Sequence, residues 1–87
     1  MGYAIEVIPS CKKSITKLCQ RNPSLENALR RKIEEVIENP LRFKPLQHSF
    51  AGEYRVHILK SFVLIYRVDG ATVRLLFFGH HDEAYRI

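Results

Sequence analysis

Apolar and polar residues alternate in four short segments of the chain, at residues 3–8, 53–59, 61–69 and 72–78. Each segment is rich in β-branched or aromatic residues, and this composition together with the alternation predicts a β-strand. Asp69-Gly70, between the last two segments, is typical of a tight hairpin turn. The pattern therefore predicts a three-stranded antiparallel meander, with the strand at 3–8 added at its edge or beside it.

Two segments between these strands have apolar residues at helical spacing. In the first helix, which we expect Ser10 to cap after Pro9 ends the strand, the apolar residues are Cys11, Ile15, Leu18 and Cys19. In the second, which we expect Asn22 to cap and Asn39-Pro40 to end, they are Leu25, Leu29, Ile33, Val36 and Ile37. The two form a helical hairpin. The following segment, 41–52, has no clear period and is expected to be a connecting loop.

These elements predict an α+β fold in which an N-terminal strand and a helical hairpin pack on one face of a mainly antiparallel β-sheet. We expect one domain over residues 1–87, without an internal repeat or a linker. The shared core is expected to contain Leu18, Leu29, Ile33, Leu64 and Leu76. The sheet face without helices is left open for a ligand.

Fourteen Lys and Arg residues against nine Asp and Glu residues give a net charge of +5 and a pI near 9.5. This balance suits a polyanionic partner, although basic surfaces also serve solubility alone. No run approaches the roughly 18 apolar residues of a membrane span, and the N-terminus lacks the order of a secretory signal. We therefore expect a soluble cytoplasmic protein. Cys11 and Cys19 would lie about 12 Å apart on one helix, too far for a disulfide bond.

All four histidines, His48, His57, His80 and His81, lie in the second half of the chain. Alternation places Arg55 and His57 on one face of their strand, which is either a solvated face or half of a phosphate site. The pair His80-His81 has three interpretations: a solvated pair, a metal site with His57 or Asp82, or a catalytic group. The spacing fits a structural zinc site poorly, and we predict neither a metal nor a cofactor.

The stretches KPLQ (44–47), EYRVHI (53–58), FVLIYRVD (62–69) and GHHDEAYR (79–86) together resemble the RelE/ParE superfamily of toxins from type II toxin–antitoxin systems. The resemblance spans nearly the whole chain and implies a RelE-like fold and an acidic, RelB-like antitoxin as partner. RelE-like members are endoribonucleases that cut mRNA on the ribosome, whereas ParE-like members poison DNA gyrase. Three functions stay open: a ribosome-dependent mRNA endoribonuclease, a non-enzymatic gyrase inhibitor, and an inert relative that only binds its antitoxin.

The resemblance also implies site residues. Arg55 matches the arginine of the family's YRV strand, and Tyr85 matches an aromatic residue that faces the RNA. His57 and His81 match histidines that do acid–base work in the YafQ-like branch. The chain departs from that branch at position 44, where the branch has a third histidine and this chain has Lys44. It departs again at Ser61 and Phe62, and Val63 replaces an arginine found in other members of the superfamily. We therefore leave open whether histidine or arginine leads catalysis.

Metal-free RNA cleavage explains why these residue types suit the task. A base takes the proton of the 2′-OH, an acid protonates the leaving 5′-oxygen, and cations hold the charged phosphorane. Histidine suits both proton transfers, arginine suits the phosphate, and tyrosine offers a ring for stacking. The expected catalytic residues are thus His57, His81, Tyr85 and Arg55, with Lys44 and Lys60 as RNA-binding residues. The antitoxin is expected on the helical hairpin or the sheet edge, where it meets Lys12, Lys13, Lys17, Arg30 and Arg31.

Overall fold

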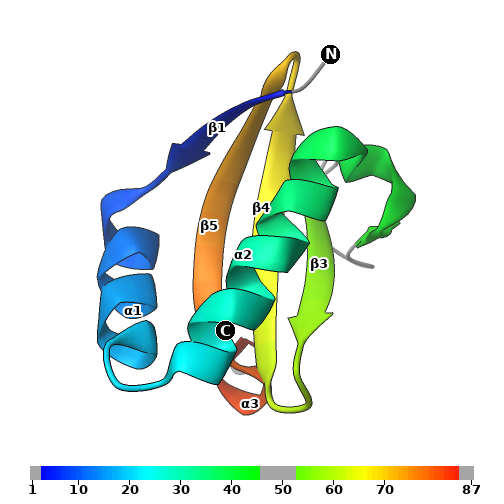
Figure 1. The fold of residues 1–87 in the computed structure, drawn as a ribbon. Helices are drawn as coiled ribbons and strands as arrows, with labels where there is room; N and C mark the ends of the chain where they lie inside the picture. The colour runs from blue at the N-terminus through cyan, green and yellow to red at the C-terminus, as the bar shows by residue number, and fades with distance from the viewer. Residues whose placement is uncertain (1–2, 46–52, 85–87) are drawn as a thin grey trace.

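A computed structural model describes residues 3–45 and 53–84, in which two long helices pack on one five-stranded sheet (Figure 1). The strands are β1 (Ala4–Val7), β2 (Lys44–Pro45), β3 (Glu53–Ile58), β4 (Phe62–Asp69) and β5 (Thr72–His80). Their order across the sheet is β1-β5-β4-β3-β2. The antiparallel meander β3-β4-β5 is confirmed. The sheet is nevertheless mixed, because β1 pairs in parallel with β5.

The helical hairpin consists of α1 (Pro9–Cys19) and α2 (Pro23–Glu38), which cover the same face of the sheet (Figure 1). Asn22 caps α2 as expected, because its Oδ1 accepts a hydrogen bond of 3.2 Å from the backbone N–H of Leu25. The expected cap of α1 was wrong: Pro9 itself is the first helical residue, and Ile8 precedes it without a side-chain cap. Proline suits this position because the first turn needs no N–H donor. Within 3–45 and 53–84, no helix combines the length and the apolar character that a membrane crossing requires.

Part of the segment expected to be a plain loop forms regular secondary structure. Pro40–Arg42 forms a 3-10 helix, η1, and Lys44–Pro45 forms β2, which pairs antiparallel with β3. The phenolic hydroxyl of Tyr66 donates a hydrogen bond of 2.5 Å to the backbone carbonyl of Pro40 and ties η1 to β4. The remainder of that segment, 46–52, lies outside the described residues.

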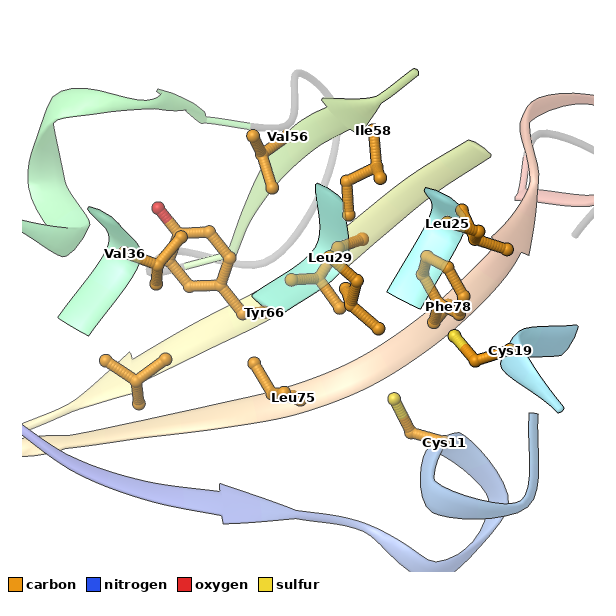
Figure 2. Packing of buried hydrophobic residues seen from close by; sticks show 12 residues of the cluster. Cys11, Cys19, Leu25, Leu29, Val36, Val56, Ile58, Tyr66, Leu75 and Phe78 are labelled. Atoms are coloured by element: carbon orange, nitrogen blue, oxygen red, sulfur yellow. The ribbon is translucent and has the colours of Figure 1, made fainter. Parts of the chain in front are cut away.

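The hydrophobic core lies between the helices and the sheet (Figure 2). Leu29 and Leu64 are buried in it as predicted, and Leu18 and Ile33 pack against it from partly buried positions. The two-layer α+β fold is therefore confirmed. Cys11 and Cys19 face this core as free, buried thiols (Figure 2). Burial raises the pKa of the Cys11 thiol to about 11.

Leu76 is the exception among the predicted core residues. The register between β4 and β5 shifts at Ile65 and Tyr66: Ile65 pairs with Phe77 and Tyr66 pairs with Leu75, so that Leu76 is an extra residue in β5. Such a bulge changes which residues face the core. Leu75 and Phe78 are buried there, and Leu76 is only partly buried and outside the cluster.

Candidate functional site

One end of the sheet face opposite the helices holds a compact group of side chains. In the paired strands, His57 of β3 lies opposite Val63 of β4, which in turn lies opposite Gly79 of β5. Alternation along β4 places Val63 on the open face, because its neighbour Leu64 belongs to the core. Val63 is nevertheless fully buried. The short helix α3 (His81–Ala84) packs on β4 and β5 at this end.

The structure brings His57 and His81 together. Their imidazole rings are stacked, with centroids 5.3 Å apart and an angle of 25° between the planes. His57 projects from β3, and His81 is the first residue of α3. The backbone N–H of His81 donates a hydrogen bond of 2.7 Å to the carbonyl of Ser61. This bond fixes the start of α3 to the β3–β4 turn, and thus sets where the His81 ring can lie.

A pocket of about 350 Å³ opens beside the two rings. Its lining consists of His57, Lys60, Ser61, His80, His81 and Asp82. The Asp82 carboxylate lies 3.8 Å from Nδ1 of His81. From the sequence, Asp82 was expected only as a possible metal ligand. The sole indication in the sequence that Asp82 contacts His81 is that the two residues are neighbours.

His80 differs from His81 in its surroundings. It is the last residue of β5 and pairs with Phe62. Its ring packs on the Phe62 ring, with centroids 4.6 Å apart. Phe62 in turn stacks on the core residue Phe78. Adjacent positions at the strand end thus place one imidazole against His57 and the other against the Phe62 ring.

The remaining predicted site residues are Arg55, Lys44, Lys60 and Tyr85. Arg55 precedes His57 by two positions on the same face of β3 and is partly buried. Lys44 of β2 pairs with Arg55 in the register, so both cationic residues lie at one level of the sheet. Lys60 lines the pocket and is exposed. Tyr85 lies outside the described residues, so its predicted role stays a prediction.

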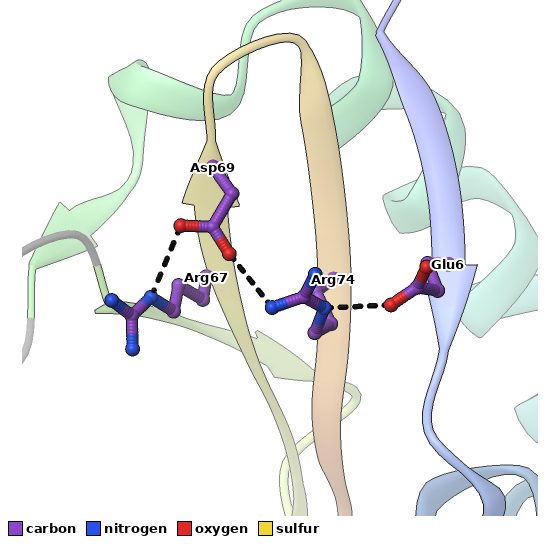
Figure 3. A network of polar contacts seen from close by, with 4 residues as sticks. All are labelled: Glu6, Arg67, Asp69 and Arg74. Carbon is purple, nitrogen blue, oxygen red and sulfur yellow. Dashed lines mark hydrogen bonds and ion pairs between the residues drawn. The ribbon is translucent and has the colours of Figure 1, made fainter.

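The opposite end of the open face carries a chain of charges that sequence reasoning missed (Figure 3). Arg74 of β5 contacts Glu6 of β1 and Asp69 of β4, with an N–O distance of 2.7 Å to each carboxylate, and Arg67 lies 3.4 Å from Asp69. The hydrogen bond and charge of Glu6 raise the pKa of Arg74. The charges of Arg67 and Arg74 are balanced here by those of Glu6 and Asp69. This end of the open face therefore attracts a polyanion less than two unpaired arginines would.

The histidine end can move protons at a bound ligand. A neutral imidazole can take a proton from a ligand in the pocket, and a protonated imidazole can give one to it. Lys60 adds a positive charge at the pocket, which suits an anionic ligand. Within residues 3–45 and 53–84, no three His, Cys, Asp or Glu side chains gather closely enough to hold a metal ion.

Comparison with known proteins matches residues 8–85 to the sequence model of a family described as "ParE toxin of type II toxin-antitoxin system, parDE". A relative from Methanocaldococcus jannaschii, named "Putative toxin RelE4", is 42% identical over 86 residues, which cover 97% of this chain and 92% of the relative.

Two solved toxin–antitoxin complexes contain chains of the same fold. The DinJ–YafQ complex of E. coli matches with a TM-score of 0.80 and 25% identity, over 98% of this chain and 99% of that chain. The toxin–antitoxin complex RelBE2 of Mycobacterium tuberculosis matches with a TM-score of 0.73 and 25% identity, over 93% of this chain and 100% of that chain. The topology and the order of elements are thus shared along nearly the full length of all three chains.

Proposed function

The chain belongs to the ParE toxin family of type II toxin–antitoxin systems, and from this premise we propose that it is a metal-independent endoribonuclease that cuts mRNA on the ribosome. Because its target is the translating ribosome, it acts in the cytoplasm. The observation that carries the proposal is the stacked pair His57 and His81 beside a pocket that Lys60 also lines. An inhibitor that only binds its target has no need for two imidazoles in contact.

The proposed reaction uses the RNA's own 2′-OH as nucleophile. One of the two imidazoles takes the proton of the 2′-OH, and the oxygen attacks the adjacent phosphorus. The bond from phosphorus to the 5′-oxygen breaks, and the other imidazole, in its protonated form, gives its proton to that leaving oxygen. The products are a 2′,3′-cyclic phosphate and a 5′-hydroxyl. No metal takes part in these steps.

Cations and a ring support this reaction in the proposal. Arg55 and Lys60 hold the non-bridging phosphate oxygens, because charge on those oxygens grows as the phosphorane forms. The role of acid goes to His81, whose Nδ1 lies 3.8 Å from the Asp82 carboxylate. His57 is then the base. Lys44 is proposed to bind the RNA backbone, and Tyr85 to stack on a base of the RNA.

The experiment is cleavage of a defined mRNA on programmed ribosomes by the purified protein, in the presence of a metal chelator that leaves the ribosomes intact. We expect fragments that end in a 2′,3′-cyclic phosphate, and a bell-shaped dependence of kcat/KM on pH. His80→Gln serves as a matched control, because it replaces the imidazole that packs on Phe62. This variant should keep both limbs of the pH profile, whereas His57→Gln and His81→Gln should each lose one. A wild-type protein that leaves ribosome-bound mRNA intact would refute the proposal.

A second candidate function is inhibition of DNA gyrase, because the matching family is described as ParE toxin. A supercoiling assay with purified gyrase separates the two candidates. Inhibition that persists in His57→Gln and His81→Gln, with no RNA cleavage, would support the gyrase function. Expression of folded protein that leaves growth unaffected would instead indicate an inert relative that only binds its antitoxin.

We also propose that an acidic antitoxin binds the helical hairpin. A groove of about 550 Å³ lies between α1 and α2. Apolar side chains of both helices line it, Ile15 from α1 and Leu29 and Ile33 from α2, and Arg30 lies beside them. An amphipathic helix would place its apolar face in such a groove.

The outer side of α1 supports the acidic character of that partner. A hollow of about 710 Å³ there is lined by Lys12, Lys13 and Lys17, which would meet the partner's carboxylates. Co-expression with the acidic protein of the neighbouring reading frame should give a stable complex. Ile33→Asp should weaken this complex without affecting RNA cleavage by the free toxin. An Ile33→Asp complex as tight as the wild-type complex would place the antitoxin elsewhere.

A further inference from the structure

The turn between β3 and β4 has an unusual residue at its first position. β3 ends at Ile58 and β4 begins at Phe62, and these two residues pair, so that the turn consists of Leu59, Lys60 and Ser61. Leu59 has a φ of 56° and is the sole residue other than glycine with positive φ in the part of the chain that the structure describes. Glycine or asparagine would adopt this conformation at lower cost, because a leucine side chain crowds the backbone there. The requirements of the backbone therefore do not explain a leucine.

Packing does not explain this leucine either. Its exposed fraction is 55%, and it is not part of the hydrophobic core cluster or of the side chains packed against that cluster. A large apolar side chain in an unfavourable backbone conformation, with half of its surface in water, stabilises the fold little. Such outliers concentrate at functional sites, where the strain is compensated by what the residue does.

The position of the turn indicates what that function is. The other two turn residues, Lys60 and Ser61, line the pocket of the histidine pair, and the Ser61 carbonyl holds the backbone N–H of His81. Leu59 is thus within one residue of the pocket lining and two residues from His57. A single-stranded RNA that places a phosphate in this pocket also brings the neighbouring nucleotides over the turn. Unstacked bases offer flat, weakly polar faces that apolar and aromatic side chains cover.

We propose that Leu59 is a substrate-positioning residue that packs against the base of a nucleotide flanking the scissile phosphate. This inference rests on the proposed function. Lys60 binds the phosphate, and Leu59 beside it covers the base. The contact contributes to substrate binding and takes no part in the proton transfers.

The experiment measures KM, kcat and the cut sites on programmed ribosomes for Leu59→Asn and Leu59→Met. Leu59→Asn suits the turn and removes the apolar contact, so KM should rise about 4- to 12-fold, as expected from uncovering roughly half of a leucine side chain. The value of kcat and the pH profile should stay as in the wild type, and the relative use of the cut sites should change. Leu59→Met keeps an apolar side chain, so its KM should equal that of the wild type. Leu41→Asn is the matched control, because Leu41 is similarly exposed, at 58%, and lies in η1.

Each result leads to a different conclusion. An unchanged KM and unchanged cut sites in Leu59→Asn, with an active wild type, would overturn this inference and leave the proposed function intact. A fall in kcat with an altered pH profile would also overturn it, because Leu59 would then act by positioning His81. A wild type that cuts no RNA would refute the proposed function and this inference with it. The melting temperature of Leu59→Asn should equal or exceed that of the wild type.

Discussion

His57 and His81 stack on each other with their ring centroids 5.3 Å apart, although one residue belongs to β3 and the other begins α3. If the two rings share the proton transfers of one reaction, they act as a unit. We expect His57→Ala and His81→Ala each to lower the cleavage rate about 10²- to 10⁴-fold. The double variant should be no more than about threefold slower than the slower single variant. Multiplicative losses in single-turnover assays of folded protein would indicate two independent roles.

Leu75 and Leu76 are adjacent leucines with opposite environments, because the bulge in β5 buries the first and leaves the second outside the core cluster. Leu75→Ala should lower the free energy of unfolding by about 2–5 kcal/mol, the usual cost of a cavity in a core. Leu76→Ala should cost less than about 1.5 kcal/mol. Urea unfolding monitored by circular dichroism measures both. Equal losses would mean that the register of β4 and β5 has no bulge at this point.

The hydroxyl of Tyr66 is a buried donor whose partner is the carbonyl of Pro40. In Tyr66→Phe, that carbonyl would lose its donor inside the protein, and we expect a loss of about 1–3 kcal/mol. Tyr54→Phe is the comparison, because the Tyr54 ring stacks on Tyr66 but is only partly buried, so water can reach its surroundings. Thermal unfolding should show the larger loss for Tyr66→Phe. Similar losses would argue against the hydrogen bond as the stabilising contact.

Alkaline pH should destabilise the fold through Cys11. Its pKa rises from 9.0 to about 11 on burial, so between these values the folded chain holds a proton that the unfolded chain has released. Stability is therefore fully present below pH 9 and falls as the pH rises toward 11, by roughly 2–3 kcal/mol at most. Burial also raises the pKa of Tyr66, which adds in the same direction.

Urea unfolding at a series of pH values from 7 to 10.5 measures this effect. Cys11→Ala should be less stable than the wild type at pH 7, because it loses core contacts, and should show a shallower fall above pH 9. Parallel curves for the two proteins would assign the alkaline sensitivity to other groups.

Arg74 links β1 to the rest of the sheet through Glu6 and at the same time contacts Asp69 (Figure 3). β1 is an edge strand of four residues, and within the described part of the chain its backbone pairs only with β5. Arg74→Gln should raise the hydrogen exchange rates of β1 amides roughly two- to fivefold, because exposed ion pairs contribute little each. High salt should produce much of the same increase in the wild type. Unchanged exchange in both tests would show that backbone pairing alone holds this strand.

The elements that a single local period specifies were predictable from the sequence. Leu25, Leu29 and Val36 repeat at helical spacing and all three are buried in α2. Arg55 and His57 alternate with Val56 and Ile58, and the strand turns the second pair to the core. In these segments, the local preference of the backbone and the burial of apolar surface favour the same structure.

Features that depend on a distant partner or on one dihedral angle were not predictable in this way. The run LLFF at 75–78 is apolar throughout, so alternation could not reveal which residue the bulge excludes. Lys44–Pro45 is too short to show any period, and it becomes a strand only because β3 lies beside it. The residue types of this turn do not indicate that the backbone of Leu59 adopts the left-handed conformation. Family resemblance suggested both His57 and His81, but their contact depends on where Ser61 anchors α3.

The position of β5 has a consequence for synthesis of the protein. This late strand lies inside the sheet, between β1 and β4, and its pairing joins Glu6 to Arg74, 68 positions away. Until β5 has left the ribosome, the nascent chain can neither pair β1 nor bury the apolar face of α1 against β5. His81 follows directly after that strand and needs the β3–β4 turn to be formed. The histidine pair therefore cannot form before β5 and His81 have left the ribosome, so a nascent chain that stops short of them carries no formed site.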